Sequence, residues 1–467
     1  MISRSGFVSA AGAFATIATI PGRASAPRAT TLLRGSRGYD AARRNVNARL
    51  DLHPRAIAFC SDPDEIAQAI RWANEGGGPI AIRSGGHDYE GFSLNNGGVV
   101  IDVSRYRGVD VSPDGTSARI RAGTDIDTMY HRLADVGRTL PAGTCHSVAI
   151  AGLTTGGGFG LIGRRHGLMV DRLARVRLID AEGRLRDSAH DPDGEDILWA
   201  ARGGGGGNFG VVTDLFFSLL EVPPRVVIFS LEWDLTHANE VLQRWMSWAP
   251  AQSRELVAAC LLQNSPTKSV RVVGEYLGNE AALERSLEGA FSRANAREFS
   301  LESMPYIDGV ARFAGYGAAR SSWKLKSSYG EKPLGAAAIA AAAALVERAP
   351  ADVRCVLHFE TFGGAVSDVA PAATAFPHRK MTYWIQYCTY WSEPRVATHA
   401  FAWVREAFAT LDPHTAMKSY RNYCDLDLVD WRNRYHGENY ARLRHVKAKL
   451  DPGNRFTFPQ GIEPSRT

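Results

Sequence analysis

The stretch from Pro79 to His87 reads PIAIRSGGH and joins a strand pattern to a glycine turn. Apolar residues between Pro79 and Arg83 predict a short strand, which runs directly into Ser84-Gly85-Gly86-His87. Glycines leave the backbone amides bare, so a turn of this kind lets them approach a large anionic ligand. The stretch therefore predicts a phosphate or pyrophosphate site with a histidine beside it.

Two further glycine clusters follow, Gly156-Gly157-Gly158 with Gly160 and Gly203 to Gly207 with Gly210. The chain has 46 glycines in 467 residues, above the usual level of about 7%. One cluster alone is often an ordinary turn, but three within the first 210 residues favour a shared ligand. They fit neither the GxGxxG fingerprint with its acidic partner nor a Walker loop, which argues against a Rossmann dinucleotide fold and an NTPase.

The pattern around these clusters alternates short strands and helices and predicts an α+β unit. Ser61 is predicted to cap a helix with Pro63 in its first turn, and a second helix starts at Asp125. The other strands of this unit are predicted at 55–60, 98–103, 117–122, 173–180 and 184–188.

After residue 226 the strands are longer and are separated by long helices, including the Ala-rich 335–349. This pattern of long strands and long helices predicts a sheet with helices packed against one face. Its strands are predicted at 226–233, 269–275, 353–361 and 381–391, and a last helix at 438–450. The predicted division of the chain is an export signal at 1–26, a cofactor domain at 27–225, a substrate domain at 226–418 and a terminal segment at 419–467.

Composition excludes several classes of protein. The formal net charge is only +5, with no basic block of the kind that follows a phosphate backbone, so nucleic acid is not an expected partner. A hydrophobic fraction of 45% with 22% charged residues excludes disorder and a membrane bundle. We expect a monomer or homodimer that acts on a small molecule.

The first 26 residues resemble an export signal. They contain Arg4 and Arg23 but no acid, a mildly apolar stretch at 6–20, and small residues for cleavage at 24–26. The apolar stretch is too short for a stable membrane anchor. Residues 3–8 resemble a twin-arginine signal that lacks its second arginine, which indicates a periplasmic or secreted protein; the alternative is a disordered N-terminus.

The six cysteines lie far apart, without a CxxC pair or a Cys/His spacing that suits zinc. Neither a disulfide scaffold nor a metal site is therefore predicted, and most of the thiols are expected to be buried. Cys145 differs because it stands in a turn ahead of a glycine run, where a chemical role is plausible.

The motifs occur together in a recognisable order. They are Arg83 to His87, Pro141 to Cys145, Gly156 to Gly160 with Arg165-His166-Gly167, Arg202 to Gly210, Asn422-Tyr423, and Phe458-Pro459-Gln460. In these motifs, over nearly the whole chain, it resembles the berberine-bridge-enzyme-like oxidases, flavoproteins of the vanillyl-alcohol-oxidase superfamily. The resemblance implies a two-subdomain PCMH-type FAD-binding fold, completed by 419–467, and a substrate domain with an antiparallel sheet covered by helices.

The resemblance also implies FAD attached by two covalent bonds. His87 occupies the place of the histidine that bonds to the flavin 8α carbon, and Cys145 that of the cysteine that bonds to ring carbon 6. The alternatives are a hydrogen-bonded turn histidine and a buried thiol. The other residues expected to bind FAD are Arg83, Ser84, Gly85, Gly86, Gly143, Thr144, Gly152, Gly156, Gly157, Gly158, Gly160, Gly207, Asn208, Phe209, Gly210 and Val211.

Three residues are the candidates for catalysis. Oxidation of an alcohol needs a base for the hydroxyl proton while a hydride leaves the carbon, and Tyr423 matches the tyrosine that the family uses. Gln386 matches a glutamine of the family's active site, and Glu360 is a candidate second acid. The alternatives are a core tyrosine, an inward residue that holds backbone, and a glutamate on a solvated face.

Three positions bear on substrate and oxygen. Phe159 replaces a tyrosine of plant relatives that act on phenolic alcohols, and Trp384 replaces a lysine, so a cation beside Tyr423 is not predicted. Val148 matches the position that controls oxygen access, where a small residue is typical of an oxidase. Aromatic side chains along 383–391 suggest stacking of a sugar or polycycle, although a plain core accounts for at least half of them.

These observations predict an exported FAD-dependent oxidase that converts a carbinol to a carbonyl or lactone and passes the electrons to dioxygen, giving hydrogen peroxide. The carbinol would belong to a sugar, an oligosaccharide, a glycosylated metabolite or a bulky alcohol. The alternatives are oxidative ring closure or desaturation of a secondary metabolite, and a flavin-carrying binding protein without turnover.

Overall fold

The structure is a computed structural model that describes residues 27–314 and 320–465. The strands are β1 (Thr30–Leu33), β2 (Ala56–Phe59), β3 (Ile80–Arg83), β4 (Val99–Asp102), β5 (Val109–Val111), β6 (Ser117–Arg121), β7 (Arg138–Thr139), β8 (Leu173–Ile179), β9 (Leu185–Asp187), β10 (Val211–Ser218), β11 (Leu220–Glu221), β12 (Val226–Asp234), β13 (Leu256–Gln263), β14 (Ser269–Tyr276), β15 (Glu298–Met304), β16 (Ser322–Gly330), β17 (Arg354–Thr361) and β18 (Tyr383–Trp391).

The helices are α1 (Tyr39–Ala42), α2 (Pro63–Glu75), α3 (Ile126–Ala134), α4 (Ile150–Thr155), α5 (Gly163–His166), α6 (Met169–Arg172), α7 (Gly194–Ala201), α8 (Ala238–Trp248), α9 (Glu280–Ala290), α10 (Tyr306–Phe313), α11 (Ala336–Glu347), α12 (Ala397–Leu411), α13 (Trp431–His436) and α14 (Tyr440–Leu450). The mixture of helices and sheets confirms the predicted α+β class. Within the described residues, none of these helices combines the length and apolarity needed to cross a bilayer.

The first unit contains a four-stranded sheet in the order β1-β2-β4-β3, whose last three strands are parallel. The strand predicted at 79–83 is β3, and the glycine turn follows at its carboxyl end. Helix α2 begins where expected, but Asp62, not Ser61, is its N-cap, because the Asp62 side chain accepts a hydrogen bond from the Glu65 amide. Ser61 instead donates its hydroxyl to the Glu65 carboxylate.

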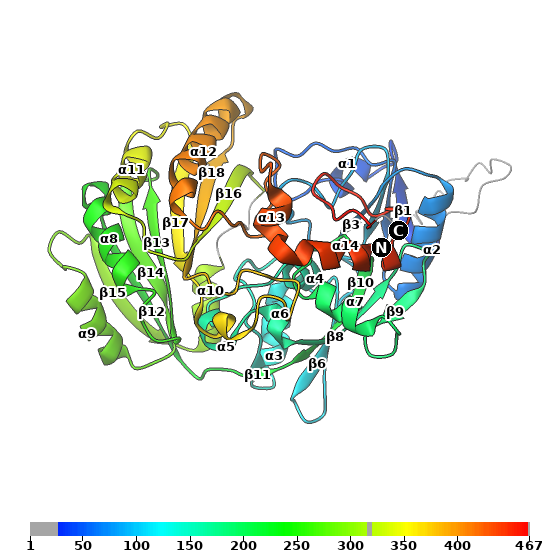
Figure 1. Ribbon diagram of the computed structural model, residues 1–467, viewed down its shortest axis with the longest axis horizontal. Coiled ribbons are helices and arrows are strands. Elements are labelled where there is room, and N and C mark those ends of the chain that lie inside the picture. Colours follow the sequence, from blue (N-terminus) through cyan, green and yellow to red (C-terminus); the bar gives the residue numbers. More distant parts are fainter. Residues whose placement is uncertain (1–26, 315–319, 466–467) are drawn as a thin grey trace, which may run out of the picture.

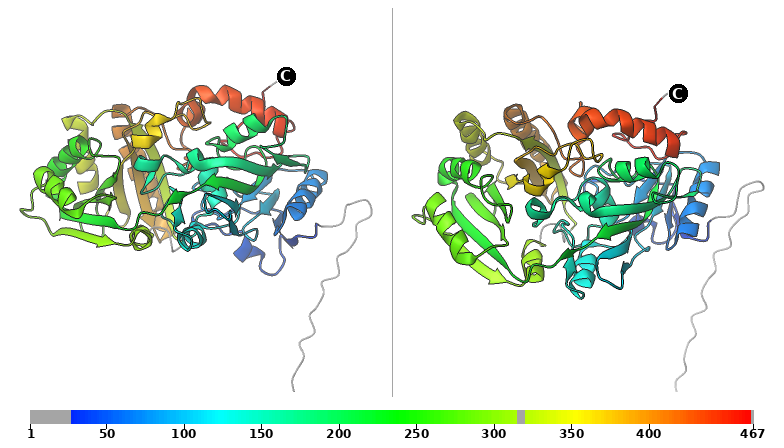
Figure 2. Two further views of the ribbon diagram at one scale, coloured as in Figure 1. Left: turned by 90° about the horizontal axis from the view of Figure 1, so that it is seen from below. Right: turned by 60° about the horizontal axis from the view of Figure 1, so that its bottom comes forward.

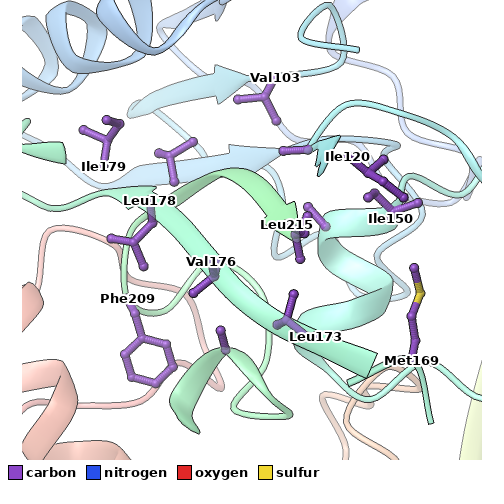
Figure 3. Packing of buried hydrophobic residues seen from close by; sticks show 14 of the residues in the cluster. Val103, Ile120, Ile150, Met169, Leu173, Val176, Leu178, Ile179, Phe209 and Leu215 are labelled. Carbon is purple, nitrogen blue, oxygen red and sulfur yellow. The ribbon is translucent and has the colours of Figure 1, made fainter. Parts of the chain in front are cut away.

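A second, antiparallel sheet of the same unit has the order β5-β6-β10-β8-β9. Its apolar face shares one core with the four-stranded sheet, and Figure 3 shows Ile120, Leu215 and Val176 of that core, which are neighbours on β6, β10 and β8. The two sheets and helices α2, α3 and α7 thus form the rigid body that carries the glycine turns.

Strands β7 and β11 pair with each other, and the remaining strands form an antiparallel sheet in the order β15-β12-β14-β13-β17-β18-β16. Helices α8, α9, α11 and α12 cover one face of this seven-stranded sheet, as predicted, and give it a separate core (Figure 1). Successive side chains of a strand point to opposite faces. On β18, Tyr383, Tyr387 and Trp391 therefore enter the helix-covered core, whereas Trp384 and Tyr390 point to the other face.

Strand β16, at the edge of this sheet, was not among the predicted strands. Lys324 and Lys326 are buried on it, where Lys324 pairs with Glu90 and Asp425 and Lys326 pairs with Asp425. These pairs connect the sheet to the turn after His87 and to the C-terminal part of the chain.

The C-terminal part of the chain returns to the first unit, where helix α14 runs across it (Figure 2). The Lys447 ammonium of α14 is fully buried and donates to the carbonyl oxygens of Asn208 and Phe456. Ile80 of β3 in turn bridges to Phe456. Segments more than 370 residues apart therefore complete one body.

Candidate functional site

A cavity of about 940 Å³ lies between the first unit and the seven-stranded sheet, on the face of the sheet opposite the helix-covered core. The predicted FAD contacts that line it are Ser84, Gly85, Gly86, Gly143, Thr144, Gly152, Gly160, Gly207 and Gly210. The first glycine turn admits no other residue, since a Cβ on Gly85 would lie 2.6 Å from the Ala149 nitrogen. The three turns thus converge on one space from separate parts of the sequence.

Other predicted FAD contacts stand behind the wall of the cavity. Gly156, Gly157 and Gly158 pack against Asn422, Phe376 and Met169. Arg83 pairs with Asp102. Asn208 donates to the carbonyl oxygens of Gly204 and Gly205, and the Phe209 and Val211 side chains belong to the core. These residues shape the glycine turns and do not face the cavity.

His87 lies at the wall of the cavity with Nε2 2.9 Å from the Ser147 hydroxyl oxygen. Burial lowers the pKa of its imidazole to about 4. The ring is therefore neutral at physiological pH and keeps a lone pair for a nucleophilic role.

Cys145 lies at the same wall and is only partly buried, whereas the other five cysteines are buried as expected. Burial raises the pKa of the Cys145 thiol, so the thiol is protonated in this state of the protein. His87 and Cys145, 58 residues apart in sequence, thus face one cavity.

Arg421 supplies an independent test of the ligand's charge. It is 6% exposed, lines the cavity, and has its guanidinium 5.6–5.7 Å from the rings of Phe92, Tyr435 and Phe458. Its Nε has no hydrogen-bond partner, and among the described residues the Asp88 carboxylate acts on it only from beyond ion-pair distance. A buried cation is costly unless an anion offsets it, so this wall fits a large anionic ligand such as FAD.

Tyr423 lies at the cavity among aromatic rings. Its ring is nearly parallel to that of Tyr89 at 5.4 Å and meets Trp384 and Tyr420 edge-on at 5.4 and 4.9 Å. Burial, and then the neighbouring Tyr89 and Glu360, raise its pKa well above 10. Tyr423 is therefore a neutral phenol at neutral pH.

Gln386 and Glu360 lie on neighbouring strands that face the same space. The Gln386 Nε2 donates to the Tyr89 hydroxyl oxygen at 3.2 Å, so the residue holds a side chain and not backbone. The Glu360 side chain is 15% exposed, with Oε2 3.3 Å from the His358 Nε2. The alternative of a solvated Glu360 is therefore wrong.

Tyr89 was not predicted, although it follows His87 by two residues and contacts both Tyr423 and Gln386. Its side chain connects the turn after His87 to the face of the seven-stranded sheet. His358 was missed as well, and the alternation Arg354, Val356, His358, Glu360 on β17 is the signal that would have placed it on the cavity face.

The positions expected to govern substrate and oxygen also line the cavity. Phe159 packs on Phe362 at 5.0 Å between ring centroids, Trp384 lies against His358 at the same spacing, and Val148 is half-buried at the wall. The cavity therefore brings together all the candidate catalytic and substrate positions and both proposed attachment residues.

Comparison with known proteins points to one family. The FAD binding domain family matches residues 54–188, and the family "Berberine and berberine like" matches 419–463. The chain is 35% identical to YgaK, an FAD-linked oxidoreductase of Bacillus subtilis, over 92% of this chain and 95% of that protein. It is 30% identical to the monolignol oxidoreductase AtBBE-like 13 of Arabidopsis thaliana, over 82% and 79%.

Solved structures agree with these relatives. BBE-like 1 of Physcomitrella patens has a TM-score of 0.87 at 27% identity and covers 94% of this chain and 98% of its own. Phl p 4, a grass pollen allergen with glucose dehydrogenase activity, has a TM-score of 0.84 at 25% identity and covers 94% and 97%. These similarities extend over both units of the fold.

Proposed function

The chain belongs to the berberine-bridge-enzyme-like family of FAD-linked oxidoreductases, and from this premise we propose that it is an oxidase that acts on an alcohol carbon. FAD, when bound, would supply the acceptor for a hydride from that carbon, and dioxygen would take the electron pair to give hydrogen peroxide. The observation that carries the proposal is the convergence of His87, Cys145, Tyr423, Gln386 and Glu360 on one cavity. The monolignol oxidoreductase and Phl p 4, named for alcohol and sugar chemistry, support it.

The cofactor is bound covalently through His87 and Cys145 in this proposal. Such a bond forms from a neutral imidazole, and the lowered pKa of His87 keeps its ring neutral at physiological pH. Arg421 lies at the cavity wall near the glycine turns, where its positive charge would balance an anionic part of FAD. In this proposal the cofactor domain ends at residue 225 and the substrate domain at residue 418, because cofactor and substrate would contact different walls of the cavity.

The proton of the substrate hydroxyl needs an acceptor. Tyr423 contacts the hydroxyl in this proposal, but its raised pKa keeps it a phenol at neutral pH. Glu360 is the carboxylate whose charge reaches Tyr423. We therefore assign Tyr423 to orient and relay the proton, Glu360 to accept it, and Gln386 with Tyr89 to hold the hydroxyl in place.

Anaerobic flavin reduction by a panel of alcohols and sugars tests the proposal. Tyr423→Phe and Glu360→Gln are each expected to slow flavin reduction by about 10²- to 10⁴-fold, the usual contribution of acid–base catalysis. The residual rate of Glu360→Gln should rise with pH, because an ionised Tyr423 must then act alone. The wild-type rate of flavin reduction should not change over the pH range in which the rate of Glu360→Gln rises.

Tyr383→Phe is the matched control, since Tyr383 lies on the same strand but faces the helix-covered core. It should reduce its flavin at the wild-type rate. Unchanged reduction in both Tyr423→Phe and Glu360→Gln would remove these residues from the mechanism, and a flavin that no alcohol reduces would remove the function.

Dioxygen is the acceptor in this proposal because Val148 is small. A variant of Phl p 4 that includes an Ile-to-Val change is described as a glucose oxidase, whereas the parent is described as having dehydrogenase activity. Export by residues 1–26 completes the proposal; these residues lie outside the described ones, and N-terminal sequencing of protein from the periplasm or medium tests it.

A further inference from the structure

Three carboxylates of the seven-stranded sheet line the cavity, and each has a basic neighbour. Glu302 lies 2.9 Å from Arg312, Glu298 lies 3.9 Å from Arg271, and Glu360 lies beside His358. Arg271 also donates from Nε to the Ser230 hydroxyl oxygen. The charges on this face are thus mostly compensated within it.

Arg354 is the exception. It occupies the first position of β17 and points to the cavity, with its guanidinium carbon 5.4 Å from the centre of the Tyr390 ring. Its Nε is buried without a hydrogen-bond partner, and no acid of the described residues comes within ion-pair distance. Burying a polar group of this kind without a partner is costly, and a charged partner would offset that cost.

The position of Arg354 along the sheet sets its distance from the proposed site of oxidation. Trp384, which contacts Tyr423, and Tyr390, which underlies Arg354, both face the cavity on β18. They are six positions apart, or about 20 Å at the rise of an extended strand. A ligand that reaches both the proposed site of oxidation and Arg354 is therefore longer than a monosaccharide.

We propose that Arg354, with Tyr390 beneath it, binds an oxyanion that the substrate carries at the end remote from the oxidised alcohol; this rests on the proposed function of the cavity. A guanidinium presents paired donors that match a carboxylate or a phosphate, and the aromatic ring fixes its plane. The preferred substrate is thus an acidic oligosaccharide or glycoside and not a small neutral alcohol.

Three probes of equal length test this subsite with the flavin-loaded enzyme. They are cellotriose, the same trisaccharide with a uronic acid at its non-reducing end, and the same trisaccharide phosphorylated at that end. In the wild type, kcat/KM of anaerobic flavin reduction should be about 10- to 100-fold higher for the better anionic probe than for cellotriose. This is the range of a charged hydrogen bond. Which anion is preferred distinguishes a carboxylate from a phosphate substrate.

Arg354→Gln should remove the preference by slowing the reaction of the anionic probes, whereas Arg354→Lys should retain part of it. Arg312→Gln is the matched control, because Arg312 lines the same cavity but is paired with Glu302, and it should keep the preference. The preference should also shrink with added salt. Equal kcat/KM for the three probes in the wild type, or an unchanged preference in Arg354→Gln, would overturn the subsite.

Calorimetric titration of the same holoenzymes separates the two proposals. Tighter binding of an anionic probe that is lost in Arg354→Gln supports the subsite even if no probe reduces the flavin, in which case the proposed alcohol oxidation fails alone. Reduction by all three probes without a difference in affinity supports the oxidase and overturns the subsite. Flavin absorbance and melting temperature confirm that each variant is folded.

Discussion

His87 has an imidazole whose pKa burial lowers to about 4, and this fixes the pH range in which a covalent bond can form. We predict that apo-protein carrying Cys145→Ser, which leaves His87 as the proposed attachment, incorporates FAD at a constant rate from pH 8 to pH 6. The rate should fall only as the pH approaches 4, because only there is the nucleophilic ring protonated. In-gel flavin fluorescence after denaturation measures the rate.

An exposed histidine would lose its nucleophile near its ordinary pKa of about 6.5. A profile with its midpoint there would show that the His87 ring is solvated when FAD binds, and would contradict the buried geometry.

The residues within recognisable motifs could be predicted from sequence, and residues that act through the folded arrangement could not. His87 and Cys145 belong to glycine-bearing motifs and were placed at the cavity in advance. Arg421 and Arg354 look like ordinary surface arginines in a sequence, since only the fold reveals that each has a buried Nε without a partner and no ion pair among the described residues. Tyr89 was missed because its partners, Tyr423 and Gln386, lie some 300 residues away.

At the scale of elements, the buried pairs of Lys324 hold strand β16 to two other parts of the chain. We predict that Lys324→Met lowers the free energy of unfolding by about 3–5 kcal/mol, because it leaves Glu90 and Asp425 buried with less compensating charge. Urea denaturation followed by tryptophan fluorescence measures the loss.

Lys268→Met is the control for that experiment. The Lys268–Glu347 pair is exposed, and its removal should change stability by less than about 1 kcal/mol. Equal effects of the two substitutions would mean that the Lys324 pairs contribute no more than a surface pair.

The same lysines explain why β16 escaped prediction. Its neighbours β17 and β18 are rich in apolar and aromatic residues, so their patterns predict strands. In the sequence SWKLKSSYG the lysines suggest a solvated segment. Their partners Glu90 and Asp425 stand 234 and 101 positions from Lys324, and no local pattern can pair them in advance.

At the scale of the whole molecule, the cofactor would touch cavity walls contributed by distant parts of the chain, from Ser84 to Arg421. With both tethers removed in His87→Ala/Cys145→Ala, we predict a melting temperature that rises with added FAD, because a ligand that binds only the native state stabilises it by mass action. The tethered wild type should show no such dependence, since its FAD is attached in stoichiometric amount.

Acid precipitation provides the companion measurement. The wild-type pellet should be yellow and the pellet of the double variant colourless. A melting temperature of the double variant that ignores FAD, or a colourless wild-type pellet, would contradict covalent attachment at these residues.

The bridge between Ile80 and Phe456 also constrains the timing of folding during synthesis. A ribosome adds about 5–20 residues per second, so roughly 20–75 s separate the appearance of these two residues. During that interval β3 and the glycine turn lack their C-terminal support, including Lys447 beneath Asn208. The glycine turns therefore gain this support only after Phe456 has left the ribosome, and we expect the cofactor to be captured after that point.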